Sequence, residues 1–190
     1  MTAAPTTVAA PVRRTLPVMR HLLMVFCALT ALAVVALFVL SENTAETFAW
    51  TIQPPITAAF LGAGYAAGFV LVALSLRDPV WAHNRVPVLT IFVFVALTLV
   101  ATLVHINKMH FDDDFGGLSF LAKGAAWFWL AVYVFVPVGM AVALYRQERA
   151  PGVDPEPEHP VPMPLRVALG LESAVLLVVG MMLFVDPTTA

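Results

Sequence analysis

A single carboxylate lies inside an apolar stretch near the end of the chain. Glu172 belongs to the apolar run 167–185 and follows Arg166 by six residues, which in a helix is a rise of about 9 Å. An acid at such a depth in a membrane is costly, so we expect it to face a partner, a cavity or another subunit. A proton or cation relay, or a hydrogen bond between subunits, would use such a group. A protonated or snorkelling acid near the membrane boundary is the alternative.

A second group of reactive side chains lies in a short connection after residue 104. It contains two histidines and three aspartates within ten residues: His105, His110, Asp112, Asp113 and Asp114. Imidazole and carboxylate groups are ligands for zinc and other divalent ions. However, His105 and His110 would be about 140° apart on a continuous helix, and neither a HExxH motif nor an EF-hand loop is present. We therefore assign no metal ligand here and expect a solvated acidic loop, with metal binding as the alternative.

Other signatures of chemistry are missing from the sequence. No pair of histidines lies in mid-span, where a transmembrane haem would need its axial ligands. P-loops, dinucleotide-binding fingerprints and nucleophile elbows are absent as well. The net charge of -2 and the lack of a Lys/Arg cluster argue against a nucleic-acid partner. We expect no cofactor and a protein that is not an enzyme.

Long apolar helices must position these residues, because the chain is 61 % hydrophobic and only 12 % charged. Each of five apolar runs has about the length that crosses the roughly 30 Å hydrocarbon core of a bilayer. These runs are residues 22–40, 56–76, 86–106, 124–145 and 167–185. The sequence thus predicts an all-α, polytopic transmembrane helical bundle with five spans in one membrane domain, residues 20–186.

The segments outside the predicted spans differ in composition. Residues 1–19 are rich in Ala, Pro and Thr, so we expect a disordered cytoplasmic tail. The first apolar run is longer than a signal-peptide core of roughly 7–15 residues, and we interpret it as a retained anchor. Six prolines in the connection 150–165 favour an extended, semi-rigid cytoplasmic linker. Residues 187–190 form a short tail.

Basic residues alternate between the two sets of connections. Eight of the ten Lys and Arg residues lie before the first span or in the second and fourth connections, whereas Lys108 and Lys123 lie on the opposite side. The positive-inside rule then places the N-terminus in the cytoplasm and the C-terminus outside. We expect a multi-pass protein of the bacterial plasma (inner) membrane, with the lipid bilayer as its constant partner.

The predicted span 56–76 has the small residues of a helix-packing surface. Helices in lipid approach one another where side chains are small. Gly64 and Gly68 have the GxxxG spacing, and Gly62 lies on another face of the helix. We therefore expect this span at the centre of the bundle, with a hydrogen-bond partner for Tyr65. Self-association through Gly64 and Gly68 is the alternative.

A resemblance covers the first four spans. Residues 47–65, TFAWTIQPPITAAFLGAGY, and the His- and Asp-containing connection before a Trp-rich span resemble a group of bacterial multi-pass membrane proteins with no assigned activity. The resemblance implies a multi-pass fold and carries over no site residue.

Small size, short connections and the missing catalytic motifs favour a non-catalytic accessory or assembly component of the membrane, in contact with other membrane subunits. A small proton- or cation-coupled transporter or channel that uses Glu172 is the alternative.

Overall fold

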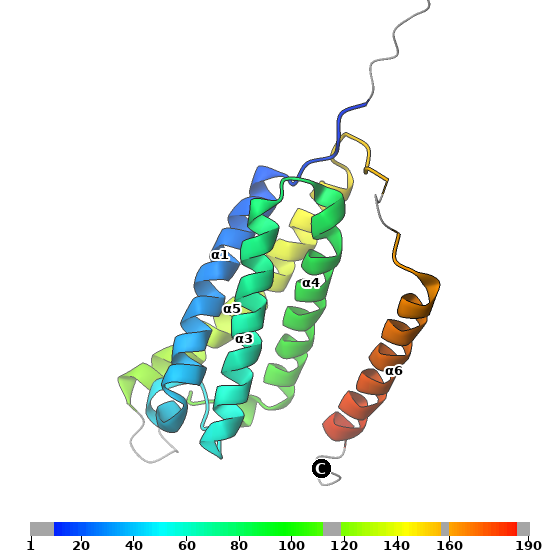
Figure 1. Ribbon diagram of the computed structural model, residues 1–190. Coiled ribbons are helices and arrows are strands. Elements are labelled where there is room, and N and C mark those ends of the chain that lie inside the picture. Colours follow the sequence, from blue (N-terminus) through cyan, green and yellow to red (C-terminus); the bar gives the residue numbers. More distant parts are fainter. Residues whose placement is uncertain (1–9, 112–118, 157–159, 186–190) are drawn as a thin grey trace, which may run out of the picture. The chain divides into compact units, whose positions relative to one another are not determined.

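The computed structural model describes residues 10–111, 119–156 and 160–185 (Figure 1). These residues form five helices that are long and apolar enough to cross a membrane, and they contain no β-strand. The predicted all-α class with five candidate spans is confirmed. The chain divides into two compact units, Met1–Asp154 and Pro155–Ala190, where the sequence predicts one membrane domain. The boundary between the two units falls in the proline-rich connection, which precedes the last helix in the sequence.

The first unit is a bundle of four long helices. They are α1 (Pro17–Val34), which continues into the π-helix η1 (Val35–Val39), α3 (Pro55–Arg77), α4 (Trp81–Val104) and α5 (Phe120–Glu148). Figure 1 shows that α1 packs on α3, that α3 packs on α4 and that α4 packs on α5. Because α5 also contacts α1, the four helices form a closed ring of neighbours. The second unit contains α6 (Met163–Val185).

Local signals extend several helices beyond their apolar runs. Pro17 and Pro55 begin α1 and α3, where the missing proline N–H has no helical partner to lose. Ser119 caps α5, because its hydroxyl oxygen accepts a hydrogen bond from the Ala122 N–H at 3.0 Å. The apolar runs therefore predict the spans correctly but underestimate the lengths of the continuous helix Pro17–Val39 and of α5.

The predicted disordered tail is wrong for residues 10–19, whereas residues 1–9 lie outside the described part of the chain. α1 begins at Pro17, within that predicted tail. The Arg13 N–H donates to the Val153 carbonyl at 2.9 Å, and the Thr15 N–H donates to the Pro79 carbonyl at 2.8 Å. Composition predicted disorder, but these backbone groups have partners that are distant in sequence.

α3 approaches α1 and η1 most closely at Gly62. A Cβ atom at Gly62 would lie 2.6 Å from the backbone nitrogen of Phe38. In contrast, a Cβ at Gly64 would meet nothing within 4 Å, and one at Gly68 would meet only Thr30 Cγ2, at 4.0 Å. The close contact therefore uses Gly62 and not the GxxxG pair. α3 is contacted from two sides, as expected, but it is one of four helices in the ring and not a central one.

We predict that Gly62→Ala destabilises the bundle and that Gly64→Ala does not. The new methyl group of Gly62→Ala overlaps the η1 backbone, and such overpacking costs about 1–3 kcal/mol. Gly64→Ala has free space and gains helix propensity of roughly 0.5–1 kcal/mol. Thermal unfolding of both variants in one detergent measures the difference. Equal midpoints would contradict the proposed close approach.

Candidate functional site

A pocket of about 580 Å³ lies among the four long helices of the first unit. Helices α1, α3, α4 and α5 all contribute to its lining, which is mainly aliphatic and aromatic. This is the size of a small-molecule site. The polar side chains in the lining are few: Thr30, Thr47, Tyr65, Thr90, Trp129 and Tyr133.

Two tyrosines from different helices meet at this pocket. Tyr65 of α3 and Tyr133 of α5 are 8 % and 5 % exposed, and their hydroxyl oxygens are 2.6 Å apart, so one hydroxyl donates to the other. The predicted hydrogen-bond partner of Tyr65 is thereby confirmed. The polar contact therefore joins α3 and α5.

Sequence reasoning missed Tyr133, although a signal was present. Tyr65 lies ten residues after the start of α3, a rise of about 15 Å, and Tyr133 lies thirteen after the start of α5, about 20 Å. Alternating spans begin at the same end of a bundle, so the two phenols are placed at similar depth. Comparing the depths of polar residues on alternate spans would have paired them.

Aromatic rings surround the tyrosine pair. The Trp129 ring lies 4.5 Å from the Tyr133 ring and 6.3 Å from the Tyr65 ring, measured between centroids. Phe94 meets Tyr65 in an edge-on arrangement at 6.0 Å. The Trp129 indole N–H donates to the Thr102 hydroxyl at 3.1 Å, which satisfies its only polar group. This cluster forms a rigid aromatic wall along the pocket.

His110 packs between two connections at the end of the bundle where α3 begins. The side chain is 1 % exposed, so the expected solvated loop is wrong at this residue. Its Nδ1 donates to the Phe48 carbonyl at 2.9 Å, and its Nε2 hydrogen-bonds the Thr51 hydroxyl at 3.1 Å. The connection after α4 is thus fastened to the segment before α3.

The other predicted site residues belong to three different parts of the chain. The His105 Nδ1 lies 3.0 Å from the Ala101 carbonyl of its own helix. Asp112, Asp113 and Asp114 lie outside the described residues. Within the part that is described, no three His, Cys, Asp or Glu side chains are grouped so that they could hold a metal ion. Glu172 lies on α6, in the second unit.

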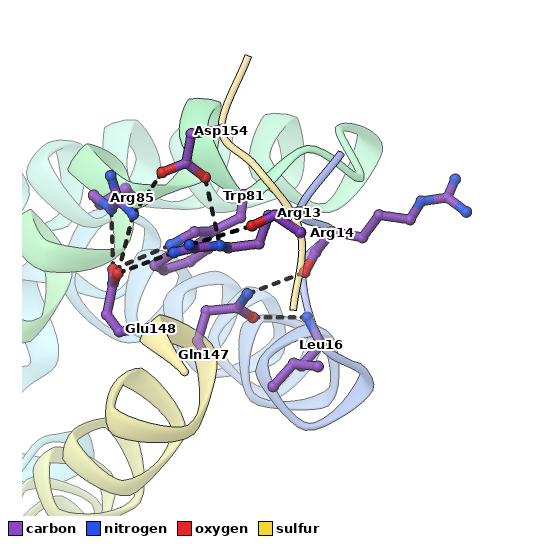
Figure 2. A network of polar contacts seen from close by, with 9 residues as sticks. Arg13, Arg14, Leu16, Trp81, Arg85, Gln147, Glu148 and Asp154 are labelled. Atoms are coloured by element: carbon purple, nitrogen blue, oxygen red, sulfur yellow. Dashed lines mark hydrogen bonds and ion pairs between the residues drawn. The ribbon is translucent and has the colours of Figure 1, made fainter. Parts of the chain in front are cut away.

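A polar network joins four segments at the opposite end of the bundle (Figure 2). Arg85 of α4 makes a bidentate contact with Glu148, with both N···O distances at 3.0 Å, and reaches Asp154 at 2.9 Å. Glu148 also accepts a hydrogen bond from the Trp81 indole N–H at 3.1 Å. Arg13 lies 3.5 Å from Glu148 and 3.7 Å from Asp154. Two arginines therefore share two carboxylates.

Gln147 holds the segment before α1 in the same network. Its side chain is fully buried, its Oε1 accepts from the Leu16 N–H at 2.7 Å, and its Nε2 donates to the Arg14 carbonyl at 3.0 Å. Figure 2 shows the Gln147 amide pointing from the end of α5 toward these two backbone groups. One amide therefore satisfies a backbone donor and a backbone acceptor of the same partly buried segment.

The turn between α3 and α4 completes this end. Asn84 Nδ2 donates to the Asp78 carbonyl at 2.8 Å and to the Thr15 hydroxyl at 3.2 Å. The Val80 N–H and the His83 ring hold the pKa of the Asp78 carboxyl below its usual value, because both stabilise its charged form. The network as a whole positions backbone segments and pairs charges.

Comparison of the chain with protein-family models, with curated proteins and with solved structures finds no match. The chemistry of the site therefore has to be inferred from its own residues. The pocket offers an apolar volume with a hydroxyl pair, and the network offers structural closure of one end of the bundle.

We predict that Gln147→Leu loosens the segment before α1. The substitution removes the partner of the Leu16 N–H and of the Arg14 carbonyl, and a hydrogen bond of this kind contributes about 0.5–1.5 kcal/mol. The expected results are a lower unfolding temperature and faster tryptic cleavage after Arg14. Gln53→Leu is the matched control, because Gln53 is exposed. Unchanged cleavage in Gln147→Leu would show that the amide does not hold this segment.

Proposed function

We propose that the chain is a non-catalytic accessory or assembly component of the bacterial inner membrane. Its N-terminus lies in the cytoplasm and its C-terminus outside. The observation that supports this proposal is that the paired charges and the buried Gln147 hold the segment before α1 against the start of α4 and the end of α5. This closes one end of the bundle, and the pocket at its interior is apolar. A closed end and an apolar interior favour a scaffold over a water-filled path.

The orientation is supported by how the basic residues group in space. Arg13 and Arg85 share the carboxylates of Glu148 and Asp154, so the segments that carry most of the basic residues meet at one end of the first unit. The connection that carries Lys108 is fastened through His110 to the residues before α3, at the other end. By the positive-inside rule, the arginine-rich end is the cytoplasmic one.

We predict a clear labelling pattern for single cysteines in a Cys27→Ser background. Asn107→Cys and Glu156→Cys both place the thiol at an exposed position, one in each set of connections. A membrane-impermeant maleimide is expected to label Asn107→Cys in intact spheroplasts and Glu156→Cys only after permeabilisation. Cys27→Ser alone reports the background. The reverse pattern would invert the proposed orientation.

We predict that the protein leaves native membranes in a complex of fixed stoichiometry. Extraction into polymer nanodiscs, followed by native mass spectrometry, measures the mass and composition of the particle. The competing function is proton- or cation-coupled transport through Glu172. It predicts a species with no other subunit, and an ion flux in liposomes that Glu172→Gln abolishes. The exposed Glu156→Gln is the control for that flux. Such a flux would overturn the scaffold role.

A further inference from the structure

The lining of the pocket extends along α5 and includes exposed residues. Along α5 its lining runs from Phe120 to Tyr133, which is a rise of about 20 Å. Phe120, Leu121 and Leu32 belong to the lining and are nevertheless 93 %, 60 % and 52 % exposed. Since the lining helices are candidate spans, a ligand would enter from the hydrocarbon region of the bilayer. The shape and the route suit a lipid-soluble molecule with an extended chain.

The lining favours an uncharged head group. Among the described residues that line the pocket there is no Asp, Glu, Lys, Arg or His. A phosphate or ammonium group at this depth would therefore lack a countercharge, which is costly in hydrocarbon. A phospholipid could place only an acyl chain here, and that chain would make no use of the tyrosine hydroxyls.

The tyrosine pair can serve a ligand either as donor or as acceptor. The Thr30 and Thr47 hydroxyls donate to the Phe26 and Asn43 carbonyls of their own segments, at 2.7 and 2.8 Å. The hydrogen bond between Tyr65 and Tyr133 can run in either direction. In one direction the Tyr65 oxygen has a lone pair to accept with, and in the other its O–H is free to donate. A carbonyl and a hydroxyl are therefore both accommodated at the same place.

The surrounding rings favour a flat head group. Trp129 and Phe94 border the tyrosine pair, with centroids 4.5 to 6.3 Å from the tyrosine rings. Aromatic side chains pack on other flat rings edge to face or offset, with favourable energy beyond the area buried. A ring that carries an oxygen function, attached to a long hydrocarbon chain, meets all of these conditions.

We propose that the pocket binds a lipid-soluble quinone or its quinol. The ring lies beside Tyr65 and Tyr133, and the hydrocarbon chain follows α5 toward Phe120. The quinone carbonyl accepts a hydrogen bond from Tyr65, and the quinol hydroxyl donates one to it. This binding site goes beyond the scaffold role and does not depend on a partner subunit.

The test is quenching of tryptophan fluorescence by decylubiquinone in the purified full-length chain, since Trp129 lines the pocket. Gly64→Leu fills the pocket from α3, and Gly124→Leu fills it from α5. Both glycines line the pocket, and an added Cβ would meet nothing within 4 Å at either. Gly139→Leu on α5 is the matched control, because its Cβ is equally free and Gly139 does not line the pocket.

Saturable quenching is expected in the wild type and in Gly139→Leu, with affinity at least tenfold weaker in Gly64→Leu and Gly124→Leu. Tyr65→Phe removes one hydrogen bond and is expected to weaken binding about threefold to tenfold. Thermal unfolding of each variant confirms that it is folded. Equal quenching in all variants would mean that the quinone only partitions into the micelle. Displacement by equimolar 1-decanol would mean that the pocket recognises a chain and not a ring, and either result overturns the proposal.

Discussion

The absence of water in the hydrocarbon region governs this structure, because every polar group within a span must find its partner in the protein. Several hydroxyl groups in the spans do so locally. Thr30, Ser75 and Thr98 each donate to the carbonyl four residues earlier in the same helix, at 2.7 to 3.0 Å. Such bonds satisfy the side chain but do not hold helices together. The tyrosine pair, the indole of Trp129 and the close approach at Gly62 make specific contacts between helices.

At the arginine-rich end of the bundle, the buried amide matters more than the ion pairs. The Arg85 and Glu148 side chains are 34 % and 45 % exposed, so their attraction is screened and is typically about 1 kcal/mol or less. Gln147 is fully buried and makes two partly buried hydrogen bonds to the backbone, so these bonds are less screened than the ion pairs. The ion pairs and the amide therefore join the same segments, and the amide is the better shielded of the two connections.

The sequence predicts the helices well because one property, an apolar run of sufficient length, determines them. It predicts contacts poorly where they join distant segments. Residues 13–15 have the composition of a disordered tail, yet their partners lie near residues 79 and 153. His110 reads as part of an acidic loop, yet it bonds the Phe48 carbonyl. The sequence predicts that Tyr65 has a partner, but the identity of that partner depends on how α3 and α5 cross.

The positions of small residues in the sequence do not reveal the pocket. A glycine in a membrane helix can admit a neighbouring helix or leave a space, and sequence spacing does not distinguish these outcomes. Gly62 admits the backbone of η1, whereas Gly64 and Gly68, which have the familiar GxxxG spacing, line the pocket. The pocket is thus a property of four helices together.

The space persists because α5 is fixed at three levels. At its start, the Ser119 hydroxyl donates to the Glu46 carbonyl at 2.5 Å; at its middle, Tyr133 bonds Tyr65; at its end, Gln147 bonds the backbone before α1. A helix held only at its two ends could still bend toward the space at its middle. The hydrogen bond between Tyr65 and Tyr133 joins α5 to α3 at this level. The same two hydroxyls therefore fix α5 at mid-span and give the pocket its polar group.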